Sequence, residues 1–260
     1  MIYSDLVQTH SHHKSMSQNE TILPGGRTTP VVVRIGETVR RPPSQNAEFV
    51  RSLLRHLELA GFDGAPRYLG TDASGREIFS FMPGAVPAEL ENHDDTTLQE
   101  VARLIRAYHA TAPLFATPSA RKACIEVACH NDLSPCNTVF RDRRPVAFID
   151  FDAAAPGSRS WDLGYAAWLW LDLGNPEHSA NEQLRRLRLF AAAYGSGPSE
   201  AQIIGATLER QTILISEANR SGNTAMSCWA RDCREWTVRH MPTAATPPRT
   251  SLDHLVGGHE

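Results

Sequence analysis

The chain has 260 residues, of which 41% are hydrophobic, and its formal net charge at pH 7 is −3. This content is enough for a substantial core, and the length suits one large domain or two lobes around a cleft. The charge gives no sign of a nucleic-acid partner, and no apolar run reaches the roughly 18 residues that a membrane span needs. The first 20 residues lack the apolar stretch of a secretory signal, so we expect a cytoplasmic protein.

Residues 21–82 are predicted to form a small lobe made mostly of strands, after a flexible N-terminus at 1–20. β-Branched and aromatic runs bounded by turn residues predict its strands, and apolar residues at helical spacing predict one helix that stops at Gly61. The expected elements are strands at 31–36 and 37–42, a helix at 47–62 and a hairpin formed by 66–72 and 76–82.

Met82-Pro83-Gly84 interrupts this pattern and is a candidate hinge. The rest of the chain is predicted to be a mainly helical lobe at 83–241, followed by a flexible tail at 242–260. The expected elements are a helix at 96–111, strands at 124–130 and 145–151, helices at 161–173, 181–194 and 199–220, and a last helical pattern that ends near 240.

The stretch CHNDLSPCNTVF, residues 129–140, carries several polar groups between the two predicted strands of the second lobe. Asp132 follows one strand, Asn137 comes five residues later, and Asp150 closes the other strand. A carboxylate in a loop can accept a proton from a hydroxyl, while carboxylate and amide oxygens bind hard cations such as Mg²⁺. Taken alone, the stretch also fits an ordinary polar turn.

Three motifs in order favour a catalytic loop over a polar turn. HNDLSPCN (130–137), FIDFD (148–152) and WDLGYA (161–166) together resemble the aminoglycoside phosphotransferase and choline kinase-like family. In that family the loop reads H-G-D-L-x-x-x-N and the second motif opens with I-D. The resemblance covers about residues 20–240. It implies an α+β, two-lobed protein-kinase-like fold with a small mixed sheet lobe and a mainly helical large lobe.

The resemblance also implies roles for the acidic and amide residues. Asp132 would be the catalytic base that orients the acceptor hydroxyl. Asn137 and Asp150 would be ligands of Mg²⁺. Asp152 stands where the related protein-kinase motif has glycine, and it either joins the metal site or faces solvent.

Two further implied roles concern loop support and nucleotide binding. His130 would brace the catalytic loop rather than act as a nucleophile, and Asp162 would hold the same loop from the following helix. The backbone around Ser80, Phe81 and Met82 would pair with the adenine of ATP.

The small lobe departs from the family pattern in ways that bear on nucleotide binding. Arg40, or Arg41 as the alternative, stands where a phosphate-binding lysine is expected, and arginine presents a planar fork in place of a point charge. Val50 stands near the place of that lysine's usual glutamate partner. Gly25 and Gly26 form a short candidate phosphate loop, and a plain turn is an equal interpretation.

We therefore expect transfer of the γ-phosphate of ATP or GTP, with Mg²⁺, to a hydroxyl of a small molecule. The acceptor would be an aminoglycoside-like antibiotic, which implies antibiotic resistance, or an amino alcohol such as choline, or a sugar. Glu209, Glu217 and Asp232 are candidates for holding a cationic acceptor. The alternatives are a nucleotide-binding pseudokinase and an immunity protein that binds a toxin or antibiotic without modifying it. The oligomeric state is not predicted.

Overall fold

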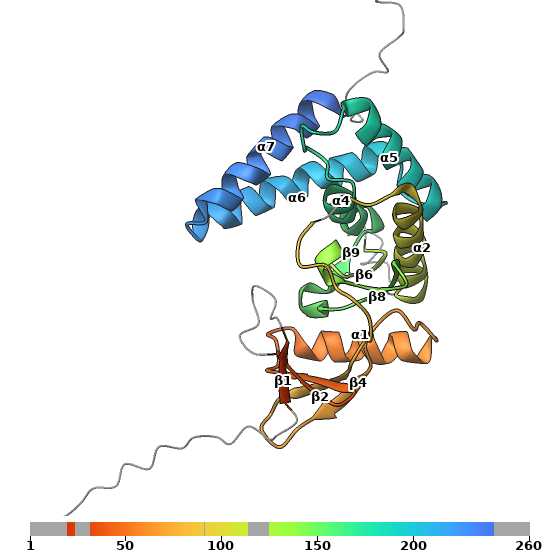
Figure 1. The fold of residues 1–260 in the computed structure, drawn as a ribbon, viewed down its shortest axis with the longest axis vertical. Coiled ribbons are helices and arrows are strands. Elements are labelled where there is room, and N and C mark those ends of the chain that lie inside the picture. The colour runs from red at the N-terminus through yellow and green to blue at the C-terminus, as the bar shows by residue number, and fades with distance from the viewer. Residues whose placement is uncertain (1–19, 24–31, 91, 114–124, 242–260) are drawn as a thin grey trace, which may run out of the picture. The chain divides into compact units, whose positions relative to one another are not determined.

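The computed structural model describes residues 20–23, 32–90, 92–113 and 125–241, which Figure 1 shows as a ribbon. They form two compact units, one drawn from Met1–Pro43 and Leu69–Phe81 and the other from Ser44–Tyr68 and Met82–Glu260. The predicted helix near residue 50 thus groups with the second unit, and the domain boundaries at residues 20, 82 and 241 stay a prediction. Gly25 and Gly26 lie outside the described residues.

The first unit is built on a five-stranded sheet with the order β1-β2-β3-β5-β4. Its strands are β1 (Glu20–Leu23), β2 (Val32–Ile35), β3 (Thr38–Arg41), β4 (Tyr68–Thr71) and β5 (Glu77–Ser80). Strands β2 and β3 form an antiparallel hairpin whose turn includes Gly36, with a φ of 57° that suits glycine. β3 also pairs antiparallel with β5, so the predicted strands of this region are found in one sheet.

The second unit combines helices with two small antiparallel sheets, β6-β9 and β7-β8. Its helices are α1 (Ala47–Leu59), α2 (Asp95–Thr111), α4 (Arg159–Trp170), α5 (Ala180–Tyr194), α6 (Glu200–Arg220) and α7 (Thr224–His240). Its strands are β6 (Val127–Cys129), β7 (Thr138–Arg141), β8 (Arg144–Phe148) and β9 (Ala155–Gly157). Short 3₁₀ turns η1 (Pro135–Asn137) and η2 (Phe151–Ala153) interrupt the strand segments.

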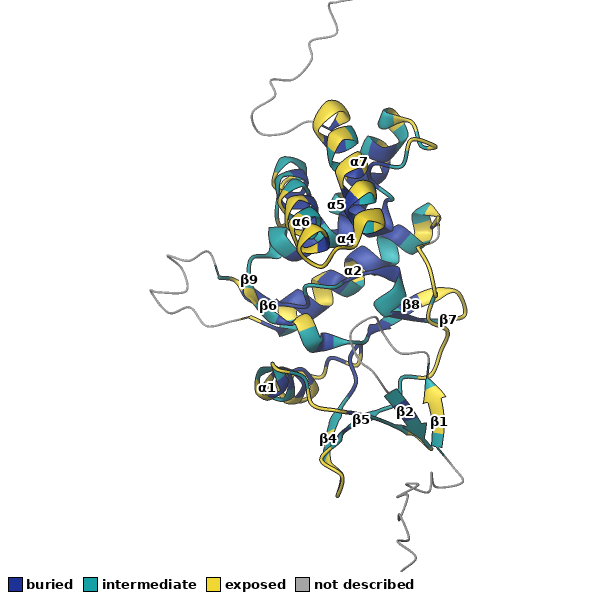
Figure 2. Cartoon of the chain, turned by 90° about the vertical axis from the view of Figure 1, so that its left-hand side faces the viewer, coloured by how far each residue is buried: buried dark blue, intermediate teal, exposed yellow. Residues whose placement is uncertain are grey.

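Helix α4 lies at the centre of the second unit, and Figure 2 shows it largely buried. The Trp168 and Trp170 side chains are almost fully buried, and the Trp168 ring stacks on that of Trp229 in α7 with centroids 4.9 Å apart. The carbonyl of Gly164 accepts a hydrogen bond from the Thr207 hydroxyl of α6 at 2.8 Å. These contacts hold α4 against α6 and α7.

The α+β class predicted from the sequence is confirmed. One local expectation was wrong, because β8 ends at Phe148 and Asp150 lies beyond it with φ and ψ both at 63°. This left-handed conformation cannot continue a strand, so the chain turns into η2 at that residue. Strands β1, β7 and β9 were not among the expected elements, and β9 reads Ala-Pro-Gly, a sequence with little strand propensity. Within the described residues, no helix has the length and apolar content to cross a membrane.

Substitution by alanine should have opposite effects on stability at Gly164 of α4 and at Gly205 of α6. In Gly164→Ala the new Cβ would lie 2.6 Å from the Cβ of Ala206, so α4 and α6 must separate, and we expect a loss of roughly 1–3 kcal/mol. In Gly205→Ala the Cβ meets nothing within 4 Å, and the higher helix propensity of alanine should stabilise the fold by about 0.5–1 kcal/mol. Urea titration measures both, and equal midpoints for the two variants would contradict this packing.

Candidate active site

The loop between β6 and β7 is fixed by backbone and side-chain contacts on both sides of Asp132. The buried Leu133 follows it, and the Trp170 indole N–H donates to the Leu133 carbonyl at 3.0 Å. Further along, the Thr138 hydroxyl donates to the Ser134 carbonyl at 2.9 Å. Asp132 itself is half-buried, so its carboxylate sits on a rigid loop with access to solvent.

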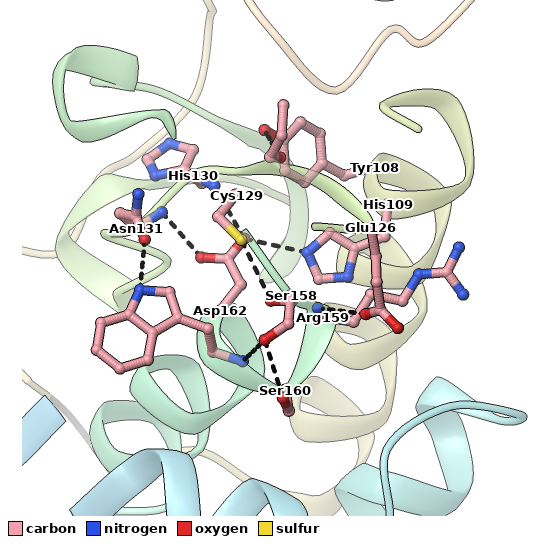
Figure 3. A network of polar contacts seen from close by, with 12 residues as sticks. Tyr108, His109, Glu126, Cys129, His130, Asn131, Ser158, Arg159, Ser160 and Asp162 are labelled. Atoms are coloured by element: carbon pink, nitrogen blue, oxygen red, sulfur yellow. Dashed lines mark hydrogen bonds and ion pairs between the residues drawn. The ribbon is translucent and has the colours of Figure 1, made fainter. Parts of the chain in front are cut away.

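Asp162, in the first turn of α4, is fully buried, and its carboxylate accepts hydrogen bonds from backbone N–H groups of this loop (Figure 3). Its Oδ2 accepts from the N–H of His130 at 2.9 Å, and its Oδ1 accepts from the N–H of Asn131 at 2.8 Å. A third donor is the Nε2 of His109, 3.0 Å from Oδ2. A buried carboxylate is stable only with such partners, so the loop and the carboxylate depend on each other.

The electrostatics of Asp162 follow from these contacts. Burial pushes the pKa of Asp162 upward, but the hydrogen bond and charge of His109 and the His130 N–H outweigh it, and the pKa lies below 3.8. His109 is held in turn by the hydroxyl of Tyr194, 2.9 Å from its Nδ1. Burial raises the pKa of Tyr194 to about 12, so this hydroxyl stays protonated. Sequence reasoning missed His109, which lies on the buried face of α2 without a motif of its own.

The His130 ring links the loop to the segment after β8. Its Nε2 is 3.1 Å from the carbonyl of Ile149, and its Nδ1 accepts from the N–H of Asp132 at 3.3 Å. A carbonyl only accepts and an N–H only donates, so the ring is the neutral tautomer with its hydrogen on Nε2. A ring used on both sides orients its neighbours and is not free to be a nucleophile.

Asn137 and Asp150 lie at the ends of the paired strands β7 and β8. The N–H of Ile149 donates to the Asn137 carbonyl at 2.9 Å, which brings the residue before Asp150 against Asn137. The Asn137 amide nitrogen donates to the Asp132 carbonyl at 3.1 Å, which leaves its Oδ1 for a cation. Among the described residues no three His, Cys, Asp or Glu side chains form a closed metal site. One amide and one or two carboxylate oxygens fit Mg²⁺, which takes its other ligands from phosphates and water.

The residues predicted to bind the nucleotide lie mainly in the first unit. The Arg40 guanidinium lies 3.6 Å from the Asp72 carboxylate, and Arg41 is buried with its guanidinium 5.0 Å from the Phe79 ring centroid. The Phe81 N–H donates to the Glu37 carbonyl at 2.9 Å, so this N–H is used within the first unit. Ser80 pairs with Thr38 in the sheet, and Met82 begins the next segment of the second unit.

An open groove, the α4–α6 groove, lies beside the loop. It is lined by residues at the start of α4 and along α6, among them Ser158, Ser160, Trp161, Gln202 and Glu209. The Trp161 indole N–H donates to the Asn131 side chain at 2.9 Å, next to Asp132 in the chain. Of the three acidic candidates for acceptor binding, Glu209 lines this groove, whereas Glu217 and Asp232 are exposed elsewhere on α6 and α7.

Comparison with known proteins agrees with this geometry. Residues 119–199 match the model of the phosphotransferase enzyme family, and they include the loop, Asp150 and Asp162. The family resemblance predicted from the sequence is confirmed. The phosphotransferase match leaves the substrate unnamed.

Individual relatives are distant. The chain is 26% identical over 258 residues to the trifolitoxin immunity protein of Rhizobium leguminosarum bv. trifolii. The alignment covers 88% of this chain and 98% of the relative. In fold it resembles a microcompartment-associated aminopropanol kinase, with a TM-score of 0.61, 16% identity and 87% and 94% of the two chains covered. It also resembles the GDP complex of an aminoglycoside 2′-phosphotransferase, with a TM-score of 0.54, 13% identity and 85% and 93% covered.

The buried carboxylate makes a prediction for stability against pH. Asp162→Asn replaces an acceptor oxygen by an amide that cannot accept from the loop N–H groups, and we expect a loss of roughly 3 kcal/mol at pH 7. Because the folded-state pKa is lowered, the carboxylate stabilises the fold fully above pH 3.8, and that contribution is lost as the pH falls through the folded-state pKa. In urea titrations the difference in stability between the two proteins should therefore shrink as the pH falls below 3.8. A difference that stays constant over that range would contradict the assignment.

Proposed function

We propose that the chain is a small-molecule kinase that transfers the γ-phosphate of ATP or GTP to a hydroxyl group. The observation that carries the proposal is the joint placement of Asp132, Asn137 and Asp150 on one hydrogen-bonded framework. Phosphoryl transfer needs a positioned hydroxyl, a metal-bound phosphate and neutralised charge more than covalent chemistry by the protein. The second unit supplies groups for the first two needs.

In this mechanism Asp132 accepts a hydrogen bond from the acceptor hydroxyl, orients its oxygen and takes its proton. The new O–P bond forms as the bond from the γ-phosphorus to the β–γ bridging oxygen breaks, and ADP or GDP leaves with that oxygen. Asn137 and Asp150, with Asp152 as a possible addition from η2, would hold Mg²⁺. When bound, the metal neutralises charge on the phosphate oxygens. His130 and Asp162 keep the loop in one conformation, so Asp132 does not reorganise during the reaction.

Nucleotide binding is proposed for residues of the first unit and the segment after it. Arg40 would bind the phosphates, with Arg41 as the alternative, and the backbone around Ser80 to Met82 would pair with the base. Arginine binds phosphate strongly through its planar fork, so the absence of a lysine does not exclude this role. The aminoglycoside phosphotransferase that shares the fold was solved with GDP, which supports GTP as well as ATP as donor.

The acceptor class is proposed to be an amino alcohol or an amino sugar that enters the α4–α6 groove. Glu209 supplies a negative charge for a protonated amine, and the Ser158 and Ser160 hydroxyls and the Gln202 amide supply hydrogen bonds to hydroxyls. The aminopropanol kinase of similar fold is named for an acceptor of this chemistry. An antibiotic acceptor would make the protein a resistance enzyme.

A second candidate is an immunity protein, and the trifolitoxin immunity relative favours it. Such a protein would bind a toxic peptide or an antibiotic without modifying it. The kinase, the immunity protein and the pseudokinase predict different results when purified protein is incubated with Mg²⁺, ATP or GTP and a panel of aminoglycosides, amino alcohols, sugars and peptides. A phosphorylated product supports the kinase. Antibiotic or peptide binding with no nucleotide-induced thermal shift supports immunity, and a nucleotide shift with no product supports a pseudokinase.

Asp132→Asn tests the base assignment with an isosteric change. Loss of the general base should lower kcat by roughly 100-fold or more, while nucleotide affinity and the unfolding midpoint change little. Asp142→Asn is the matched control, because Asp142 is exposed in the β7–β8 turn and makes no proposed catalytic contact. Product formation by mass spectrometry measures both. A variant that retains wild-type kcat would show that Asp132 is not the base.

Glu209→Gln tests the acceptor groove. For a cationic acceptor found in the panel, we expect KM to rise a few-fold and kcat to persist, because an exposed ion pair contributes up to about 1 kcal/mol. KM for the nucleotide should be unchanged. Glu217→Gln on the same helix is the control and should behave as the wild type. If both variants raise the acceptor KM equally, the effect is one of overall charge and the groove assignment fails.

A further inference from the structure

Asn131, between His130 and Asp132, has an unusual backbone conformation for its residue type. Its φ is 66°, in the left-handed region that residues other than glycine rarely adopt. The related family has glycine at this place in the loop. Asparagine tolerates this region better than most residues, which explains why it is permitted here but not what its side chain contributes.

Each polar group of Asn131 is hydrogen-bonded within the second unit. Its N–H donates to Asp162 Oδ1 at 2.8 Å, and its carbonyl accepts from Nη2 of Arg210. Its side-chain Nδ2 donates to the Ala153 carbonyl at 2.8 Å, and its Oδ1 accepts from Nε1 of Trp161 at 2.9 Å. An indole N–H only donates and a carbonyl only accepts, so these partners also fix which way the amide faces. A glycine could make the two backbone bonds but neither of the side-chain bonds.

The side-chain amide of Asn131 therefore joins the loop that carries Asp132 to the segment that follows Asp150. The proposed mechanism needs these two segments together. Ala153 belongs to η2, which begins directly after Asp150. Asp150 has a positive φ of 63°, so the segment after β8 holds a costly conformation that outside contacts must maintain. The bond from Asn131 to Ala153 is such a contact, and it comes from the residue next to Asp132.

The far end of the bridge is itself held in place. Arg210 of α6 lies with its guanidinium carbon 4.9 Å from the Trp161 ring centroid and 4.3 Å from that of Tyr165. These cation–π contacts orient Arg210 toward the Asn131 carbonyl and keep the Trp161 ring in position. Helices α4 and α6 thus both contact the loop at Asn131.

We propose that Asn131 is a positioning residue that sets where Asp132 lies relative to the metal-binding segment at Asp150, through its amide bridge from Trp161 to Ala153. The inference rests on the proposed function for its catalytic consequence, while the bridge itself is independent of turnover. Asn131→Gly separates the two contributions of this residue, because glycine keeps the positive φ and removes only the bridge.

The experiment compares Asn131→Gly and Trp161→Phe with the wild-type full chain. Trp161→Phe removes the indole N–H donor and keeps an aromatic ring under Arg210. Asn175→Gly is the matched control, since Asn175 is also hydrogen-bonded through both its side chain and backbone, in the turn between α4 and α5. The readouts are hydrogen exchange of residues 149–154 without ligands, then kcat, acceptor KM and the Mg²⁺ concentration for half-maximal rate.

Loss of the bridge should speed hydrogen exchange at 149–154 in both test variants but not in Asn175→Gly. For Asn131→Gly we expect kcat to fall by roughly tenfold or more, the acceptor KM to persist and the Mg²⁺ requirement to rise, because reacting groups are displaced while the acceptor groove is intact. Unchanged exchange overturns the bridge whether or not the protein turns over. Faster exchange with wild-type kcat and Mg²⁺ dependence overturns the positioning role. If the wild-type chain shows no turnover, only the proposed function is contradicted. Hydrogen exchange at 149–154 then still tests whether the bridge exists.

Discussion

The buried charge of Asp162 is the constraint on which the site depends. A carboxylate removed from water must be matched by hydrogen bonds, and two of its three donors are the successive backbone N–H groups of His130 and Asn131. The loop cannot change conformation without leaving this charge unpaired. These partners oppose the penalty of burial and hold the pKa of Asp162 below its ordinary value. Because α4 carries Asp162 and is itself packed on α6 and α7, the core of the second unit determines the conformation of the loop.

Three residues of this loop hold the segment after β8. The His130 ring bonds to the carbonyl of Ile149, the Asn137 carbonyl to the Ile149 N–H, and the Asn131 amide to the carbonyl of Ala153. A fourth contact comes from Asn46, whose amide donates to the Ala154 carbonyl instead of capping α1. The strained Asp150 lies inside this set of bonds. The proposed base and the proposed metal ligands are therefore arranged by protein contacts before any ligand binds, which is the condition for electrostatic preorganisation.

The sequence predicted the parts of this arrangement that local pattern encodes. Helices with an apolar stripe, such as α1 and α2, were predicted because burial imposes a 3.6-residue period. The loop was predicted because three motifs occur in order. The conformation of Asp150 and strand β9 were not, since one depends on contacts outside its own segment and the other is too short to show a period. The contact of Arg210 with Asn131 joins residues 79 positions apart and leaves no periodic signal.

An arginine at position 40 in place of the expected lysine does not by itself favour a pseudokinase over an active kinase. Asp72, the partner of Arg40, already accepts from Nε of Arg76 at 2.7 Å and from the N–H groups of Ser74 and Arg76, and these bonds lower its pKa. Arg40 adds only a longer ion pair at 3.6 Å, and its buried Nε has no hydrogen-bond partner among the residues that the structure describes. A phosphate would offer this guanidinium the shorter, bidentate contact that it lacks, while Asp72 would keep its other donors. The choice between a kinase and a pseudokinase therefore depends on turnover, not on the residue at position 40.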